Sequence, residues 1–311
     1  MGLHIAILQA AARGHRPRHK NARAVRRLRP IRPSHKAELA YKAQLLRLVG
    51  HVRTLVEHEL RELKGQWPAP AVADGIARDA LSSEADWLVH RVKGKLGGLD
   101  DFAKRLAGIA AVQNRDGVDD RLIAEIRRAI GVDVSNLLRS NGQLLQSMQK
   151  AVEANVALIK SVPGQYLDRV HETVTAGWSS GIRWESLVEQ IQRDGDITEN
   201  RAKLIARDQT AKLNSAFNQE RQQQVGIERY EWSTSEDERV RPEHAAMETL
   251  DVGFGPGVFS WADPPLKDSS GGEPCHPGED IQCRCVAIPV VDMEALELSA
   301  GIAEQEQEQA A

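Results

Sequence analysis

Five cysteine and histidine side chains in the last quarter of the chain are the residues best suited to bind a metal ion. Cys283 and Cys285 lie two residues apart, so on an extended strand both thiols face the same side. His244 precedes them, and Cys275 or His276 offers a further ligand atom. Thiolate sulfur and imidazole nitrogen are the ligands that tetrahedral zinc prefers. A structural zinc site is therefore one interpretation of these residues, and the sequence indicates no other cofactor.

Two other interpretations of the same residues stay open, because the Cys-Arg-Cys spacing differs from the C-x-x-C pattern of many zinc sites. In the first, Cys283 and Cys285 are small packed residues and His244 hydrogen-bonds a backbone carbonyl. In the second, Cys275 and Cys283 form a disulfide. Three cysteines are few for a disulfide-stabilised chain of 311 residues, and an odd number favours a reducing compartment.

Charged residues next to these side chains predict a structural ion-pair hub. Asp237, Arg239 and Arg241 follow a predicted strand, and Arg284 lies between the two cysteines. Arginine can bind a carboxylate through two parallel hydrogen bonds, which fix the geometry of a loop. We expect the hub to connect two strands. The alternative for the arginines is contact with a polyanion.

The sequence predicts no catalytic residue. It contains no G-x-x-x-x-G-K-[ST], G-x-S-x-G or H-E-x-x-H pattern. Ser233-Thr-Ser235 and Glu236-Asp-Glu238 are similar to elements of ADP-ribosyltransferases, but in those enzymes the two elements lie on separate strands. The alternative function is a nucleic-acid-processing or toxin-like enzyme with a C-terminal site around His244, whose pKa suits proton transfer.

The N-terminal segment carries a strong excess of positive charge. Residues 1–36 contain ten Lys or Arg and no carboxylate, whereas the rest of the chain has 31 basic and 44 acidic residues. We expect a flexible arm that binds the phosphates of DNA or an acidic protein surface. Its cations are Arg13, Arg16, Arg18, Lys20, Arg23, Arg26, Arg27, Arg29, Arg32 and Lys36.

The elements that must position these residues are mostly helical. Apolar residues recur at helical spacing from residue 37 to about 224. After Gly226 the pattern changes. Residues 227–234 alternate between apolar and polar, which predicts a strand, and a second strand is predicted over 283–291. The predicted helices cover 37–63, 73–111, 119–130, 138–161, 165–176, 183–193 and 197–224. Glycines at 94, 97 and 98 are expected to divide the helix over 73–111, and a turn is expected at Ser161–Gly164.

The predicted fold class is α+β, with a predominantly helical N-terminal region followed by a small mixed α/β C-terminal domain. The expected segments are a basic flexible arm (1–36), a helical domain (37–195), the C-terminal domain (196–291) and an acidic tail (292–311). No segment approaches the roughly 18 consecutive apolar residues that a membrane span requires. We therefore expect no contact with a membrane.

The order of motifs in residues 197–290 resembles the C-terminal domain of phage Mu F-like minor head proteins, over about a third of the chain. The motifs are Ala206-Arg-Asp-Gln-Thr210 with Asn214, Asn218 and Arg221, then Gly226-Ile227, Tyr230-Glu-Trp-Ser-Thr234, Asp237-Glu-Arg-Val-Arg241, His244, Cys275-His-Pro-Gly278 and Cys283-Arg-Cys285.

This resemblance implies a minor capsid protein for head morphogenesis of a tailed bacteriophage, present in few copies. The expected partners are the portal protein, the major capsid protein or both, and packaged DNA is a further partner if the basic arm binds it. The expected location is the interior of the virion head, and the host cytoplasm during assembly. The segment 196–291 is the head morphogenesis domain under this interpretation.

Overall fold

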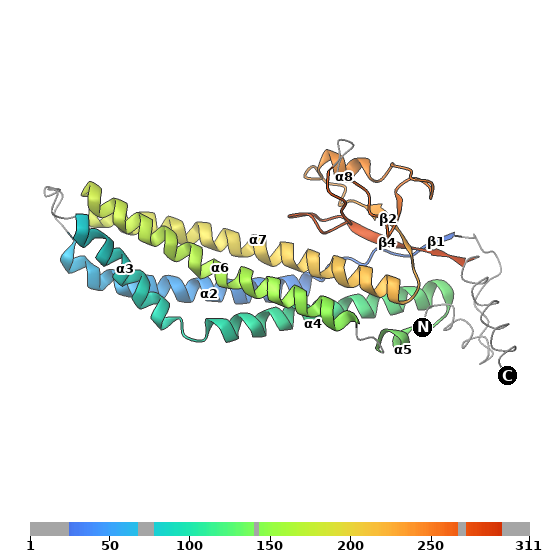
Figure 1. The fold of residues 1–311 in the computed structure, drawn as a ribbon, viewed down its shortest axis with the longest axis horizontal. Coiled ribbons are helices and arrows are strands. Elements are labelled where there is room, and N and C mark those ends of the chain that lie inside the picture. Colours follow the sequence, from blue (N-terminus) through green and yellow to red (C-terminus); the bar gives the residue numbers. More distant parts are fainter. Residues whose placement is uncertain (1–24, 68–77, 140–142, 267–271, 294–311) are drawn as a thin grey trace. The chain divides into compact units, whose positions relative to one another are not determined.

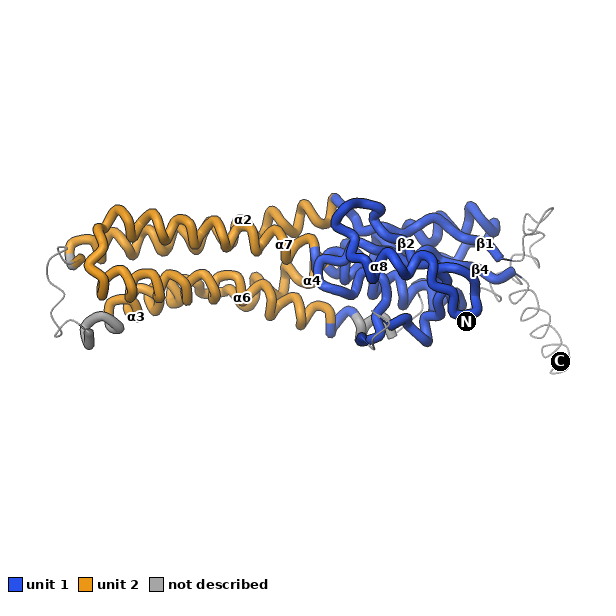
Figure 2. The backbone as a smooth tube through the Cα atoms, turned by 90° about the horizontal axis from the view of Figure 1, so that it is seen from above, with its two compact units in different colours: residues 1–35, 111–150, 208–311 blue, residues 36–110, 151–207 orange. Residues whose placement is uncertain are grey.

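The computed structural model describes residues 25–67, 78–139, 143–266 and 272–293 (Figure 1). They form helices and one four-stranded sheet, so the predicted α+β class is confirmed. The chain divides into two compact units, coloured separately in Figure 2. Unit 1 consists of residues 1–35, 111–150 and 208–311, and unit 2 consists of residues 36–110 and 151–207.

Helices make up all the described secondary structure of unit 2. Two α-helices and a short 3-10 helix lie in it almost entirely: α2 (His35–Leu63), η1 (Lys64–Gln66) and α3 (Arg78–Lys95). Three longer helices contribute residues to both units: α4 (Leu99–Ile130), α6 (Gln143–Ser180) and α7 (Trp184–Gln224). On α2 the buried positions recur every three or four residues, as at Leu45, Val49, Val52 and Val56, which confirms the predicted amphipathic helix.

The predicted helix breaks after residues 63, 130 and 176 and near Gly97 agree with the structure, and three other predicted breaks are wrong. The glycines near residue 97 separate α3 from α4, and Gly98 has a φ of +83°, which favours glycine. By contrast, α4 continues without interruption between 111 and 119, and α6 continues through Pro163. Val162 and Tyr166 beside this proline are buried, so packing outweighs the loss of one backbone hydrogen bond.

The third missing break lies at Gly195, which is inside the continuous helix α7. A Cβ at this position would lie 2.8 Å from Nε of Arg53. The absent side chain lets the arginine lie against the helix, where it binds Glu199 at 2.6 Å and Asp196 at 3.2 Å. The glycine therefore provides a close approach and does not end the helix.

The sheet lies in unit 1 and is antiparallel throughout. It contains β1 (Val25–Arg27), β2 (Arg229–Ser233), β3 (Val258–Ser260) and β4 (Val286–Asp292), in the order β1-β4-β2-β3. Two short helices, α5 (Ser135–Arg139) and α8 (Pro242–Ala246), complete the unit. Strands β2 and β4 confirm the two predicted strands within shorter bounds. The alternation on β2 buries Tyr230 and Trp232.

Gly226 terminates α7 and lets the chain enter β2. Its φ is +84°, and two hydrogen bonds close the helix end: the amide of Gly226 donates to Gln223 O and that of Ile227 donates to Gln222 O. This is the Schellman arrangement, which requires a left-handed residue at the position that Gly226 occupies. The change of sequence pattern at this glycine is therefore a real boundary between helix and strand.

Part of the predicted flexible arm belongs to the sheet instead, which corrects the prediction for residues 25–36. β1 pairs with β4 along Val25–Arg27, and Leu28 and Ile31 are buried. The apolar residues between the arginines explain this, because burying them offsets the cost of ordering the segment. Arg13, Arg16, Arg18, Lys20 and Arg23 lie outside the described residues, as does most of the predicted acidic tail.

Candidate functional site

His244, Cys283 and Cys285 form a compact buried cluster in unit 1. His244 lies on α8, and the cysteines lie in the loop that leads into β4. Nδ1 of the histidine is 3.5 Å from Sγ of Cys283 and 3.6 Å from Sγ of Cys285. All three potential ligand atoms lie within 4.8 Å of one another. The side chains are 3%, 5% and 6% exposed, so the cluster is closed to solvent.

The cysteines lie before the strand, not on it as the sequence predicted, yet their thiols still converge. Helix α7 holds this loop and the start of β4 by three hydrogen bonds between side chain and backbone. Asp208 Oδ1 accepts from the amide of Gln282 at 2.6 Å, Ser215 donates to Pro277 O at 2.5 Å, and Asn218 donates to Ala287 O at 3.3 Å. These bonds fix the segment 275–285, here called the cysteine loop, and the start of β4 to α7.

The opposite nitrogen of the histidine ring faces a carboxylate. Nε2 of His244 is buried and lies 3.5 Å from Oδ2 of Asp280. Asp280 accepts a hydrogen bond from Arg241 at 2.9 Å, and this arginine also donates to Ile281 O at 2.7 Å. The imidazole is thus oriented from both sides, by sulfur at Nδ1 and by an ion-paired carboxylate at Nε2.

The predicted ion-pair hub consists of two separate pairs. Arg284 donates two hydrogen bonds to the two oxygens of Asp237, and this guanidinium lowers the pKa of Asp237 to about 2. Arg241 pairs with Asp280 instead. The side chain of Arg239 is 67% exposed and lies 3.8 Å from Asp237, so it contributes less. Both pairs flank the cysteine loop.

Hydrogen bonds inside the cluster shift the pKa values of Cys283 and His244. Bonds with Cys285 and His244 lower the pKa of the Cys283 thiol, and the bond to Cys283 raises the pKa of His244. The amide of Cys285 also donates to Sγ of Cys283 at 3.4 Å. The surroundings therefore favour negative charge on the sulfur of Cys283.

Cys275 and His276, the predicted sources of a fourth ligand, lie outside this three-residue group. His276 makes a 2.9 Å hydrogen bond through Nδ1 with the hydroxyl of Tyr230, and burial lowers its pKa. Cys275 packs in the apolar cluster that also contains Tyr230 and Trp232. None of the three cysteines, all within residues 272–293, forms a disulfide.

The polar residues of α7 that carry the family resemblance bind backbone carbonyl groups and a carboxylate from distant parts of the chain. Asn214 donates to Ile31 O at 2.9 Å, and Arg221 binds both oxygens of Asp119 at 2.6 and 2.7 Å. Arg221 also donates to Leu138 O at 2.8 Å. These residues were predicted to lie on a helix, but no local pattern predicts their partners, which lie 83 to 183 residues away.

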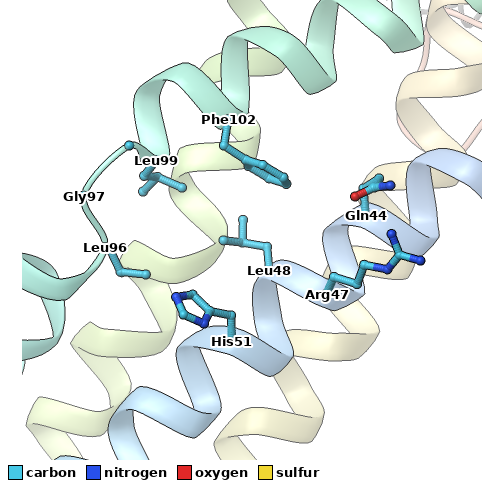
Figure 3. Close-up of a pocket in the computed structure, with 9 residues that line it drawn as sticks. Gln44, Arg47, Leu48, His51, Leu96, Gly97, Leu99 and Phe102 are labelled. Carbon is cyan, nitrogen blue, oxygen red and sulfur yellow. The ribbon is translucent and has the colours of Figure 1, made fainter.

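The described residues also line two cavities. One, of about 330 Å³, lies in unit 2 between α2 and the start of α4, where Leu48, His51 and Phe102 line it (Figure 3). The other, of about 980 Å³, lies in unit 1 and is lined mainly by apolar residues such as Met247 and Phe254. His244 and the two cysteines line neither of them. These cavities therefore provide no substrate cleft around the histidine.

No described helix is both long enough and apolar enough to cross a membrane. This finding concerns the helices of the described ranges, including α6 and α7.

Comparison with known proteins supports the resemblance. Residues 168–288 match the family model of Phage Mu protein F like protein. An uncharacterized protein of Haemophilus influenzae is 33% identical over 277 residues, which are 88% of this chain and 58% of that protein. The chain thus spans a little over half the length of this relative. No solved structure matches the chain. The resemblance is confirmed for the C-terminal part of the chain, which is similar to phage Mu protein F like proteins.

Proposed function

We propose that the chain is a minor structural protein of a tailed-phage head that acts in head morphogenesis. The match of residues 168–288 to Phage Mu protein F like protein carries this proposal, because that family suggests a head protein. The matched residues include all of α7, strands β2 and β3, and the cysteine loop.

The contacts of the motif residues support a structural role over an enzymatic one. Asp208, Ser215 and Asn218 bind loop backbone, and Arg221 is 4% exposed in its pair with Asp119. A general base must reach a substrate, whereas the ring of His244 is enclosed by sulfur and by Asp280. These contacts stabilise the fold, which supports the structural role.

The proposed partners are the portal protein or the major capsid protein. Basic residues before Val25 are the proposed contact with packaged DNA or with an acidic partner surface, because five of the ten cations of the segment lie there. Binding to phosphates would be independent of sequence and would weaken steeply with salt.

Deletion of the gene from a phage that carries it tests the head role. We expect particles without DNA or aberrant heads by electron microscopy, and restoration by the wild-type gene. Quantitative mass spectrometry of purified wild-type heads should find the chain at a small fraction of the major capsid protein. Normal, DNA-filled heads without the gene, or heads that lack the protein, would refute the proposal.

The enzymatic alternative has its own test. His244→Gln keeps a polar side chain of similar size, and its folding and incorporation into heads can be followed together with nuclease and NAD-consuming activity. We expect no such activity in the wild type. A variant that folds and incorporates normally but loses an activity of the wild type would favour the enzyme.

A further inference from the structure

We propose that His244, Cys283 and Cys285 bind one zinc ion, which ties α8 to the loop that leads into β4. The geometry and burial of this chain's own residues carry the inference, which does not depend on the proposed head role. The ion would tie two segments of unit 1 together and thereby stabilise that unit.

The distances between the ligand atoms match a tetrahedral ion. With Zn–S near 2.3 Å and Zn–N near 2.0–2.1 Å, a tetrahedral angle separates sulfur from nitrogen by about 3.6 Å. Nδ1 of His244 lies 3.5 and 3.6 Å from the sulfurs of Cys283 and Cys285. All three atoms lie within 4.8 Å of one another, so one ion can contact them after a modest movement of the sulfurs.

The surroundings of the three residues are those that metal ligands usually have. Ligating histidines commonly donate their second ring N–H to a carboxylate, and Asp280 lies on that side of His244, held in turn by Arg241. The amide of Cys285 donates to the sulfur of Cys283, which supports a thiolate. The three bonds from α7 hold the loop in position without the ion.

Packing alone accounts for the cluster less well. Cysteines that act only as small apolar residues need no nitrogen between them, whereas here one ring nitrogen is shared by two sulfurs in an apolar cluster. The other nitrogen, Nε2 of His244, is buried without a well-formed hydrogen bond. A bound cation would give both thiolates a charge partner and fix the imidazole with its N–H toward Asp280.

The group supplies three ligand atoms, whereas a closed structural zinc site has four, so the proposal assigns three of the four positions. Neither Cys275 nor His276 belongs to the group of converging ligand atoms, so the proposed site does not include the fourth protein ligand expected from the sequence. Cys275 consequently serves as a matched control, because it is a buried cysteine of the same apolar cluster.

Metal analysis of the purified full-length chain tests the site. After dialysis against metal-free buffer, we expect close to one zinc per chain by plasma mass spectrometry. Cys283→Ser and Cys285→Ser should each retain less than about a tenth of it, whereas Cys275→Ser retains it. Asp280→Asn should weaken zinc affinity by about 10- to 100-fold without removing a ligand.

Cobalt substitution keeps the test decisive if a serine variant unfolds. The wild-type chain refolded with Co²⁺ should show visible absorption of a tetrahedral ion and thiolate-to-cobalt charge transfer with an intensity for two thiolates. The charge-transfer intensity should be unchanged in Cys275→Ser. Wild-type protein that is folded, binds neither zinc nor cobalt, and whose Cys283 is alkylated rapidly would overturn the proposal.

Discussion

Buried charges in both units are neutralised by partners from distant parts of the chain. In unit 2 the carboxylate of Glu59 is fully buried and binds Arg91 at 2.5 Å and the ammonium of Lys95. In unit 1 the guanidinium of Arg221 has Asp119 and a backbone carbonyl as partners. Isolated charges in such positions would cost several kcal/mol, so these pairs restrict how the helices can pack.

Replacing Glu59 with Gln should destabilise the protein at neutral pH. The amide keeps the volume of the side chain and loses the negative charge that Arg91 and Lys95 bind. We expect a loss of about 1–3 kcal/mol in the free energy of unfolding, measured by urea denaturation. Glu62→Gln is the matched control, because Glu62 is exposed on the same helix and should change stability by less than about 0.5 kcal/mol.

The effect of Glu59 should also depend on pH. Burial by itself raises the pKa of this carboxyl, but hydrogen bonds from Lys95 and Arg91 outweigh it and lower the pKa below its ordinary value. The ion pairs therefore stabilise the fold above the unfolded pKa of about 4.3, and this stabilisation is lost as pH falls through the lower folded pKa. A difference between wild type and Glu59→Gln that persists undiminished below that range would contradict the assignment.

At the scale of elements, the cysteine loop shows how one helix can shape a segment with little regular structure. Gly278 has a φ of +89°, and its Cα lies so close to α7 that a Cβ would be 2.9 Å from Cβ of Ser215. The same serine binds Pro277 O. The loop therefore requires glycine for two reasons, a left-handed backbone and a close approach.

Gly278→Ala should destabilise unit 1 by about 1–3 kcal/mol and lower its melting temperature. Gly253→Ala separates the two causes, because Gly253 has a φ of +101° but no atom within 4 Å of an added Cβ. We expect this control to show only the cost of the left-handed backbone, and therefore a smaller loss in the free energy of unfolding. Equal losses in the two variants would mean that the approach to Ser215 contributes nothing.

The elements that sequence analysis predicted correctly are those with a local pattern. Alternation predicted β2 and helical periodicity predicted α2, whereas β4 is a nearly continuous apolar strand. β1 was missed because its arginines dominate the composition while its stabilisation comes from pairing with β4, far away in sequence. Likewise, the hydrogen bonds from α7 to the cysteine loop join residues 62 to 74 positions apart, and no local pattern encodes such a pairing.

The candidate site was predictable in part for the same reason. The residue types and spacing of His244, Cys283 and Cys285 indicated a cluster, and the structure brings these three together. The position of Cys275 outside the group, and the pairing of Arg241 with Asp280, depend on how the loops fold. Sequence order alone contains no information on those two contacts.

At the scale of the whole molecule, the two units are interleaved in sequence. Unit 1 takes residues from three separate stretches, and the region that matches the phage family begins in unit 2 and ends in unit 1. Consecutive domain boundaries such as 37–195 and 196–291 therefore do not coincide with the compact units. A fragment limited to the matched residues would lack β1 and its buried neighbours.

Two N-terminal truncations should separate folding from attachment. Removing residues 1–24 leaves β1 and the buried side chains of Leu28 and Ile31 in place, so we expect an unchanged melting temperature. Removing residues 1–36 deletes two buried side chains, each worth about 1.5–3 kcal/mol, and exposes the edge of β4. The longer truncation should therefore melt earlier and aggregate, which circular dichroism and size-exclusion chromatography would measure.

The shorter truncation also tests the basic segment, because it removes five cations without touching the sheet. If they bind DNA, the slope of log affinity against log salt should fall by up to about 4 relative to wild type. If they bind an acidic head protein, DNA affinity stays constant and incorporation into heads decreases. A folded truncated chain with unchanged DNA affinity and unchanged incorporation would show that residues 1–24 are not an attachment segment, and attachment would then have to involve the folded units themselves.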